Sequence, residues 1–177
     1  MSREKIIALV PVRKGSQRIK NKNFKPFANK KNLLTIKLEV LKQVELIDDI
    51  VVSTDSEEAI QIAKSLDVSV HNREKFYASS ECNNSQFFEN LAQNIQGDYL
   101  IYSPCTAPLI KPETYIDFIN RFSVAKKDHD SMNTINYVKE HMWLKNKPLN
   151  YNPSEAPNTQ DLPDIIKLTY GINILSR

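Results

Sequence analysis

Apolar residues along this chain fall into short continuous runs, which alternate with segments where they recur every three or four positions. The first run, "KIIALVPV", contains β-branched residues and is typical of a strand covered on both faces. The strand candidates occupy residues 5–12, 49–55, 67–71, 98–104, 131–138 and 170–176. The chain is therefore expected to carry short strands separated by other elements.

The segments between these runs predict helices, because their apolar residues recur at helical spacing or their ends carry helix-boundary residues. The predicted helices occupy residues 33–47, 55–66, 85–95 and 112–122. Asp55 and Glu58 resemble a capping box that opens the second helix. Gly97 is expected to end the third helix, and Pro112 suits the first turn of the fourth.

Strands that alternate with helices predict right-handed crossovers and an α/β fold, with a Rossmann-like, mostly parallel sheet and helices on both faces. The length of 177 residues predicts a single domain, 1–177. Residues 139–160 are polar, hold three prolines and lack helical periodicity, so we expect a polar excursion or small lobe there. A sheet of this kind binds ligands outside the carboxyl ends of its strands.

The positive charge of the chain is concentrated near its start. The formal net charge is only +3, yet ten Lys and Arg residues and no Asp or Glu lie between Lys5 and Leu38. Such local charge favours a site for a polyanion over a general nucleic-acid surface. Proteins that bind single-stranded nucleic acid interleave aromatic residues with cations, and this stretch offers only Phe24 and Phe27 at its far end. No nucleic-acid partner is therefore expected.

Cysteine usage and hydropathy point to a cytoplasmic protein without a membrane partner. Cys82 and Cys105 form no CxxC pair, disulfide framework or zinc spacing, and each suits a small buried position. No apolar run approaches the roughly 18 residues that a membrane span needs. The first apolar run is also too short for a signal peptide.

The basic stretch after the first strand is the candidate site for phosphate groups. The three glycines, Gly15, Gly97 and Gly171, complete neither a P-loop nor a dinucleotide fingerprint. Phosphates would therefore be held by side-chain cations, with help from backbone N–H groups around Gly15 and Ser16. Arg13 can form a forked, two-bond contact with phosphate oxygens, and Lys22 can act as a movable point charge. Phosphoryl or nucleotidyl transfer requires such cations to neutralise the phosphates. The alternative is a solvated basic loop.

The stretch "ALVPVRKGSQRIKNKNFKPF" resembles the opening motif of the acylneuraminate cytidylyltransferases, also called CMP-sialic acid synthetases. It departs from that motif only at Val12, where the family usually has Ala. Weaker similarities follow in "NREKFYASSECNNSQ", "SPCTAPLI", "NTQDLPDI" and "YGINIL", so the resemblance covers nearly the whole chain. It implies the α/β fold of nucleotide-diphospho-sugar transferases and transfer of CMP from CTP to a nine-carbon ulosonic acid.

The resemblance also implies roles for individual residues. Arg13 and Lys22 would be catalytic, gripping the triphosphate together with Ser16. The nucleotide-binding set would be Val10, Pro11, Arg13, Ser16, Lys22, Asn23, Arg73 and Asn83. Thr106 and Gln160 would bind the sugar acid, which could be sialic, legionaminic, pseudaminic or another ulosonic acid. The partners would be CTP, the sugar acid and a second copy of the chain in a homodimer.

The family further implies Mg²⁺, held by an Asp-x-Asp segment beyond the last strand, and this sequence ends at Arg177. The C-terminal end of the family's domain is therefore expected to be missing. The Asp-x-Asp at 128–130 reads as solvated surface, so no metal ligand is assigned. Other readings remain: a non-catalytic nucleotide-binding domain, a nucleotidyltransferase for another nucleotide or sugar, or an RNA-binding protein.

Overall fold

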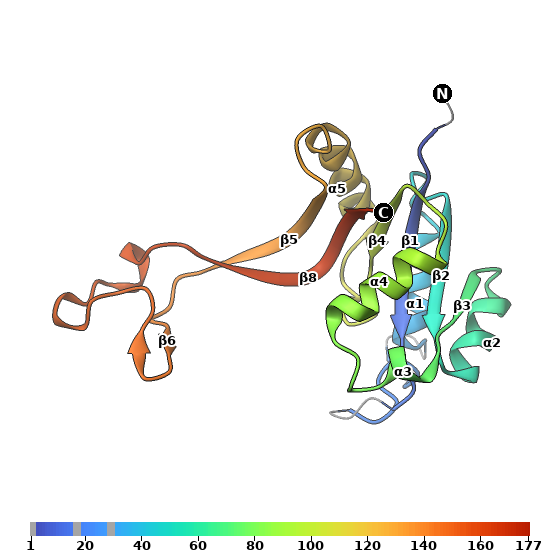
Figure 1. The fold of residues 1–177 in the computed structure, drawn as a ribbon, viewed down its shortest axis with the longest axis horizontal. Coiled ribbons are helices and arrows are strands. Elements are labelled where there is room, and N and C mark those ends of the chain that lie inside the picture. The colour runs from blue at the N-terminus through green and yellow to red at the C-terminus, as the bar shows by residue number, and fades with distance from the viewer. Residues whose placement is uncertain (1–2, 16–18, 28–30) are drawn as a thin grey trace.

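The computed structural model describes residues 3–15, 19–27 and 31–177. Six strands in these ranges form one sheet, in the order β3-β2-β1-β4-β8-β5 (Figure 1). The strands are β1 (Ile6–Val12), β2 (Asp49–Thr54), β3 (Ser69–Asn72), β4 (Tyr99–Tyr102), β5 (Ser131–Val138) and β8 (Ile165–Ser176). Strands β1 to β4 pair in parallel, and β8 runs antiparallel to both β4 and β5. The predicted α/β fold with a mostly parallel sheet is confirmed.

Helices cover both faces of the sheet because β1, at its centre, is apolar on both sides. Its residues Ala8, Val10 and Val12 lie in one buried cluster, and Ile7 and Leu9 lie in the other. On the first face lie α1 (Leu33–Leu41), α2 (Glu57–Ser65) and α5 (Pro112–Ala125), and on the second lies α4 (Asn84–Asn94). The short helix α3 (Lys75–Ala78) was not predicted from the sequence.

A two-stranded arm projects from this body (Figure 1). It consists of β5 and the first half of β8, whose pairing runs from Ile135–Leu168 to Val138–Ile165. Between them lie the short strands β6 (Trp143–Leu144) and β7 (Lys147–Pro148), followed by two 3-10 turns, η2 (Pro153–Glu155) and η3 (Thr159–Asp161). The sequence predicted only the second half of β8, because the first half is exposed and lacks a buried apolar run.

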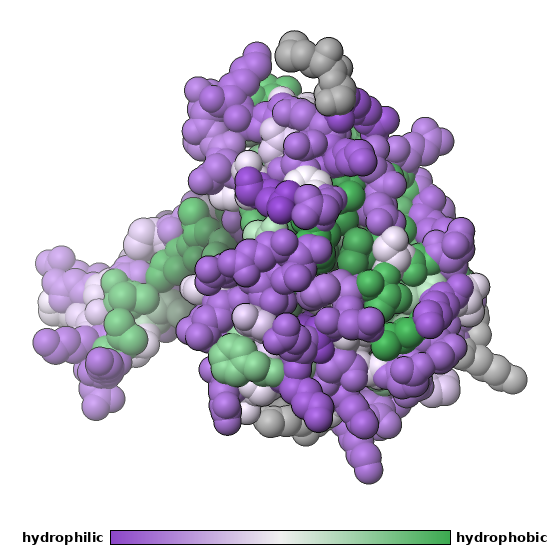
Figure 2. Space-filling model, turned by 45° about the vertical axis from the view of Figure 1, so that its right-hand side comes forward, coloured by the Kyte–Doolittle hydropathy of each residue, from purple (hydrophilic) through white to green (hydrophobic). Residues whose placement is uncertain are grey.

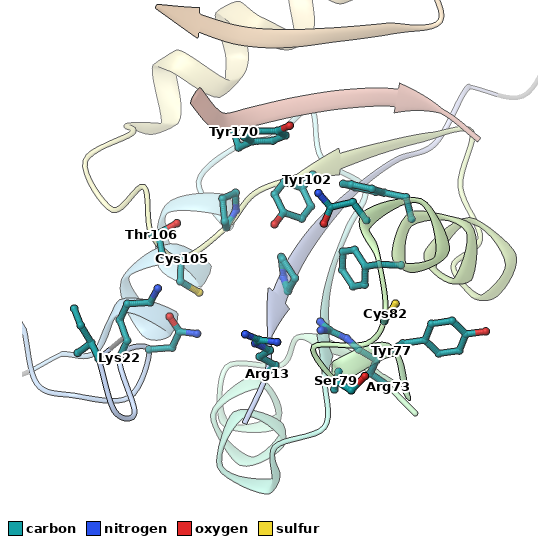
Figure 3. Close-up of a pocket in the computed structure, with 18 of the residues that line it drawn as sticks. Arg13, Lys22, Arg73, Tyr77, Ser79, Cys82, Tyr102, Cys105, Thr106 and Tyr170 are labelled. Carbon is teal, nitrogen blue, oxygen red and sulfur yellow. The ribbon is translucent and has the colours of Figure 1, made fainter. Parts of the chain in front are cut away.

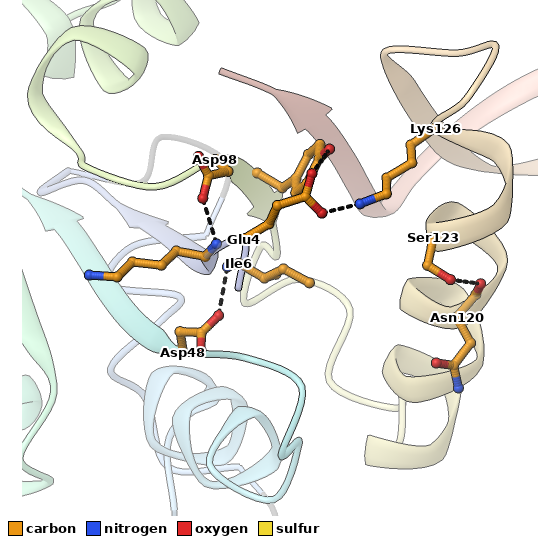
Figure 4. Close-up of polar contacts among 9 residues, drawn as sticks. Glu4, Ile6, Asp48, Asp98, Asn120, Ser123 and Lys126 are labelled. Atoms are coloured by element: carbon orange, nitrogen blue, oxygen red, sulfur yellow. Dashed lines mark hydrogen bonds and ion pairs between the residues drawn. The ribbon is translucent and has the colours of Figure 1, made fainter. Parts of the chain in front are cut away.

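Carboxylates hold the N-terminal end of β1 in place (Figure 4). The backbone N–H of Lys5 donates to Asp98 at 2.6 Å, and that of Ile6 donates to Asp48 at 2.8 Å. Glu4 accepts hydrogen bonds from Lys126 and, at 3.0 Å, from the hydroxyl of Tyr99. These contacts join β1 to the starts of β2 and β4 and to the end of α5.

Three predictions about helix boundaries are wrong. The first helix, predicted over residues 33–47, ends at Leu41. Ser56, not Asp55, caps α2, and its side chain accepts a hydrogen bond from the Ala59 N–H at 3.5 Å. The helix α4 ends at Asn94, before Gly97, whose φ is not positive. A Cβ at Gly97 would lie 2.4 Å from the Ile7 side chain, so close packing on β1 explains this glycine better than helix termination does.

The described part of the chain contains no helix long and apolar enough to cross a membrane.

Candidate functional site

A cavity of about 730 Å³ opens at the carboxyl ends of β1 and β4 (Figure 3). In open α/β sheets this edge is where ligands bind. Lys22, Arg13 and Arg73 lie along one side of the cavity, and Tyr102 and Tyr170 lie across from them. The described residues that line it are Pro11, Arg13, Ile19, Lys22, Asn23, Arg73, Tyr77, Ala78, Ser79, Cys82, Asn84, Phe87, Phe88, Tyr102, Pro104, Cys105, Thr106, Thr169 and Tyr170.

Two local features shape residues 13–15, which follow β1. The backbone N–H of Lys14 donates to the Asp55 carboxylate at 2.7 Å, which ties the end of β1 to the residue that follows β2. Gly15 then adopts a positive φ of 79°, with no atom of the described residues within 4 Å of the position of a Cβ. Gly15 is thus required for its backbone conformation, and Arg13 is left exposed on the cavity wall.

Lys22 and Asn23 reach the cavity from a compact turn before α1. The Lys22 N–H donates to the carbonyl of Ile19 at 3.2 Å, and Phe24 donates to that of Asn21 at 3.0 Å. Asn21 has a φ of 54°, which an asparagine tolerates better than most residues. The carbonyl of Asn23 accepts from the Leu34 N–H at 3.2 Å, so the turn is fastened to the start of α1.

Arg73 is a buried cation at the carboxyl end of β3. Its guanidinium donates to the hydroxyl and the carbonyl of Ser53 and lies 4.8 Å from the centre of the Phe87 ring. Burial lowers the pKa of Arg73 to about 10, while the nearby Asp55 and Tyr102 act in the opposite direction. The Arg13 charge also lowers that pKa, so the two guanidinium groups are close enough to repel each other. An anion between them would relieve that repulsion.

Aromatic side chains form the wall behind Arg73. The ring centres of Phe87 and Phe88 lie 5.4 Å apart, and those of Phe88 and Tyr102 are separated by the same distance. Burial raises the pKa of Tyr102, and the Arg73 charge partly opposes this. The cavity therefore offers cations on one side and flat apolar surface on another, a combination that suits a nucleotide.

An irregularity in β8 brings Tyr170 to the cavity. The pairing of β5 with β8 shifts between Asn133 and Ile135, so that several residues of β8 stand opposite Thr134. The Thr134 hydroxyl accepts from the Ile172 N–H at 3.1 Å and holds this bulge together. Tyr170 has a φ of 52°, a conformation that costs energy for a bulky residue and is frequent at functional sites.

The structure gathers many, though not all, of the residues implied by the resemblance. Those that line the cavity are Pro11, Arg13, Lys22, Asn23, Arg73 and Thr106. Val10 is fully buried in β1, and Gln160 lies in η3 on the arm. Asn83 caps α4 and accepts from the Gln86 N–H at 2.9 Å, while its neighbour Asn84 lines the cavity. Ser16 lies outside the described residues.

The sequence analysis missed the aromatic wall and Tyr170. Tyr102 lies near the carboxyl end of the strand predicted over residues 98–104, so the rule that ligands bind at carboxyl ends could have identified it. Phe87 and Phe88 lie in a predicted helix, but their neighbours in space come from other elements. Tyr170 depends on a bulge and a left-handed backbone conformation, which no residue pattern in this sequence indicates.

Two comparisons of sequence agree on one enzyme class. A family model described as Cytidylyltransferase matches residues 7–160 of this chain. The N-acylneuraminate cytidylyltransferase of Escherichia coli O18:K1:H7 (strain RS218 / NMEC) is 34% identical over 97 residues. That match covers 55% of this chain and 23% of the relative, so the chain matches less than a quarter of the relative's length.

Solved structures share the fold at low sequence identity. A CMP:2-keto-3-deoxy-manno-octonic acid synthetase complexed with CTP has a TM-score of 0.67 at 16% identity, covering 97% of this chain and 74% of that one. The 4-diphosphocytidyl-2C-methyl-D-erythritol synthase of Anaerococcus prevotii has a TM-score of 0.64 at 14% identity, covering 98% and 70%. A cytidylyltransferase from Leptospira borgpetersenii has a TM-score of 0.62 at 18% identity, covering 98% and 61%.

Proposed function

The chain belongs to the cytidylyltransferase family, and from that premise we propose that its cavity binds CTP and supports transfer of CMP to a sugar acid. The acceptor that we propose is a nine-carbon, sialic-type ulosonic acid, because the matched curated relative is an N-acylneuraminate cytidylyltransferase. The reaction would release diphosphate. The cytoplasm is the proposed location, in keeping with cysteines that are both free.

The observation that carries this proposal is the set of cations at the cavity. Arg13, Lys22 and Arg73 come from three different segments, and none of them forms a salt bridge among the described residues. The described lining residues also include no Asp or Glu. Cations that are not neutralised by the protein are available to neutralise a triphosphate, whose transfer chemistry depends mainly on positioning and charge stabilisation.

In the proposed step, the anomeric hydroxyl oxygen attacks the α-phosphorus of CTP. A new oxygen–phosphorus bond forms while the bond from that phosphorus to the bridging oxygen breaks, and diphosphate leaves in line. Arg13 and Lys22 would stabilise the charge that builds on the departing phosphates. The hydroxyl proton is released, and no residue of the described chain is assigned as its base.

Magnesium remains part of the proposal through family resemblance alone. Mg²⁺ prefers oxygen ligands, usually one or two carboxylates together with phosphates of the substrate. The described residues contain no group of three or more His, Cys, Asp or Glu side chains that could hold a metal, and Asp55 already accepts from the Lys14 N–H. The described residues thus do not fit a protein-held Mg²⁺ site, and we derive no step through the metal.

The arm supports the proposal of a homodimer. A two-stranded ribbon has little stability of its own in water. Apolar side chains of β5 and β8 nevertheless remain exposed on it, including Tyr137 at 64% and Ile166 at 59%. Figure 2 shows hydrophobic side chains on the projecting part of the molecule. A second copy that covers the arm would bury them, and light scattering should then give twice the mass of one chain.

Diphosphate release tests the proposed function. The chain is incubated with CTP, Mg²⁺ and either N-acetylneuraminic acid or 2-keto-3-deoxy-manno-octonic acid, and released diphosphate is measured. Release that requires the nine-carbon acid supports the proposal, and release with only the eight-carbon acid corrects the acceptor. CTP binding without release from either acid, under conditions where an authentic cytidylyltransferase is active, contradicts transfer by this chain to these acceptors.

A further inference from the structure

Lys37 occupies a position in α1 where the fold calls for an apolar residue. The helix buries Leu34, Leu38 and Leu41 on the same face, each at most 1% exposed, and Lys37 is 0% exposed. Burying an ammonium group costs free energy, and lysine is almost never fully buried unless it is paired. Lys37 forms no salt bridge among the described residues. Fold stability alone therefore gives no reason for this lysine.

The ammonium of Lys37 instead holds the two ends of the loop that follows β4. It donates to the backbone carbonyl of Ala107 at 2.9 Å and to the hydroxyl of Tyr115 at 2.7 Å. That hydroxyl in turn lies within hydrogen-bond distance of the Ser103 side chain. Lys37 thus contacts the end of the 103–107 loop directly and its beginning through Tyr115.

The same loop forms one wall of the cavity. Its middle residues Pro104, Cys105 and Thr106 all line that space. Apart from these contacts, the backbone bonds from Ser103 to Leu9 and from Ala107 to Pro104 hold the loop. The side chain of Lys37, which does not itself line the cavity, thus contacts the loop that forms this wall.

We propose that Lys37 is a positioning residue, which anchors the 103–107 loop from below so that Thr106 faces the bound substrate. Burial lowers the pKa of the Lys37 ammonium to about 8, while the neighbouring Cys105 acts in the opposite direction. The lowered pKa agrees with a free-energy cost of holding the charged group in this buried position. The anchoring follows from the geometry alone. Its effect on turnover rests on the proposed function.

Two substitutions in α1 separate anchoring from packing. Lys37→Met keeps a long, flexible side chain and removes the ammonium, which ends the cost of burying a charge but leaves the Ala107 carbonyl without this donor. Leu38→Met is the matched control, because it introduces the same residue at the next fully buried position and conserves volume. These two effects of Lys37→Met oppose each other, so its melting temperature is expected to lie close to that of the control.

Labelling of Cys105 reads out the loop without any substrate. Cys105 is 2% exposed, so it should react with a thiol reagent only when the loop opens, and peptide mass spectrometry separates it from the more exposed Cys82. Loss of a hydrogen bond to a charged group shifts an equilibrium by about tenfold or more, so Lys37→Met should raise the Cys105 labelling rate by that factor. Leu38→Met should leave it unchanged. An unchanged rate in Lys37→Met, or an equal rise in both variants, overturns the anchoring role.

Steady-state kinetics then place the effect on the acceptor side. With CTP and N-acetylneuraminic acid, Lys37→Met should lower kcat or raise KM for the sugar acid and leave KM for CTP nearly unchanged. An equal effect on both KM values overturns the assignment to the Thr106 wall. If the wild-type chain shows no turnover, the proposed function has failed, while the labelling result still decides whether Lys37 anchors the loop.

Discussion

Charges are arranged differently at the two ends of the central sheet. At the N-terminal end, Asp48 and Asp98 accept from backbone N–H groups, and Glu4 accepts from Lys126. At the carboxyl end, Arg13 and Lys22 face a cavity whose described lining residues include no carboxylate. Paired charges serve the fold, and cations left without partners are available to a ligand. The comparison predicts that mutations at the two ends separate ligand binding from stability.

The largest effect is expected from Arg13→Ala. Each lost hydrogen bond to a charged group costs about 1.5–3 kcal/mol, so CTP affinity measured by calorimetry should fall by at least tenfold. Arg13→Lys should restore part of this affinity, because a point charge cannot form the planar fork. Lys14→Ala is the matched control, since it removes the same charge from a residue that does not line the cavity. Equal losses in both alanine variants would show that only overall charge matters.

The opposite result is expected for Asp98→Ala. The carboxylate accepts from the Lys5 N–H at an exposed position, and its loss should lower the free energy of unfolding by about 1 kcal/mol. CTP affinity should not change, because the residue lies at the far end of the sheet. Urea unfolding and calorimetry measure the two quantities. A large loss of affinity here would remove the distinction between the two ends.

The pH dependence of stability tests the cost of Lys37. Its pKa is about 8 in the folded chain and near 10.5 when unfolded, so the unfolded chain binds more protons between these values. Stability should therefore rise with pH across this window through Lys37. Lys37→Met should lack this contribution, while Cys105 and Tyr115 titrate in both proteins. Urea unfolding from pH 7.5 to 9 measures the difference, and parallel curves would contradict a depressed pKa.

The smallest effect is expected from Glu4→Gln. The hydrogen bond from Lys126, followed by that from Tyr99, lowers the pKa of Glu4 below its usual 4.5. Any stability that this exposed carboxylate contributes is therefore present above pH 4.5 and lost as the pH falls through its folded pKa. The melting temperature of Glu4→Gln should lie close to that of the wild type at pH 7. The two should be equal in acid, where Glu4 is protonated and carries no charge. A large difference at pH 7 would contradict this expectation, because it would show that the exposed Glu4–Lys126 pair contributes more stability than such pairs usually do.

The sequence was sufficient to predict the body of the fold. Strands β1, β2 and β4 are continuous apolar runs, and their burial on both faces follows directly from that pattern. The first half of β8 was missed, because its side chains are exposed on the arm and carry no such pattern. Asp55 was predicted as the cap of α2 in place of its neighbour Ser56. The sequence could not show that the Asp55 carboxylate accepts from the Lys14 N–H instead.

The candidate site could be predicted where its residues follow one another along the chain. Arg13, Lys22 and Asn23 belong to one continuous basic stretch, and the structure places all three at the cavity. Tyr170 and Lys37 depend on contacts between elements far apart in sequence. Lys37 is the clearer case, since it occupies a helical face whose other buried residues are leucines, and only its contacts with Ala107 and Tyr115 set it apart.

The preference among nucleotides tests the central claim that the cavity at the carboxyl end of the sheet holds CTP. The chain is titrated with CTP, UTP, ATP and GTP under identical salt and Mg²⁺, and the rise in melting temperature is measured. Because only a ligand of the folded state raises stability, CTP should produce the largest rise, and Arg13→Ala should abolish most of it. Equal rises for all four nucleotides would contradict the account, because they would show a site for phosphates that does not recognise cytosine.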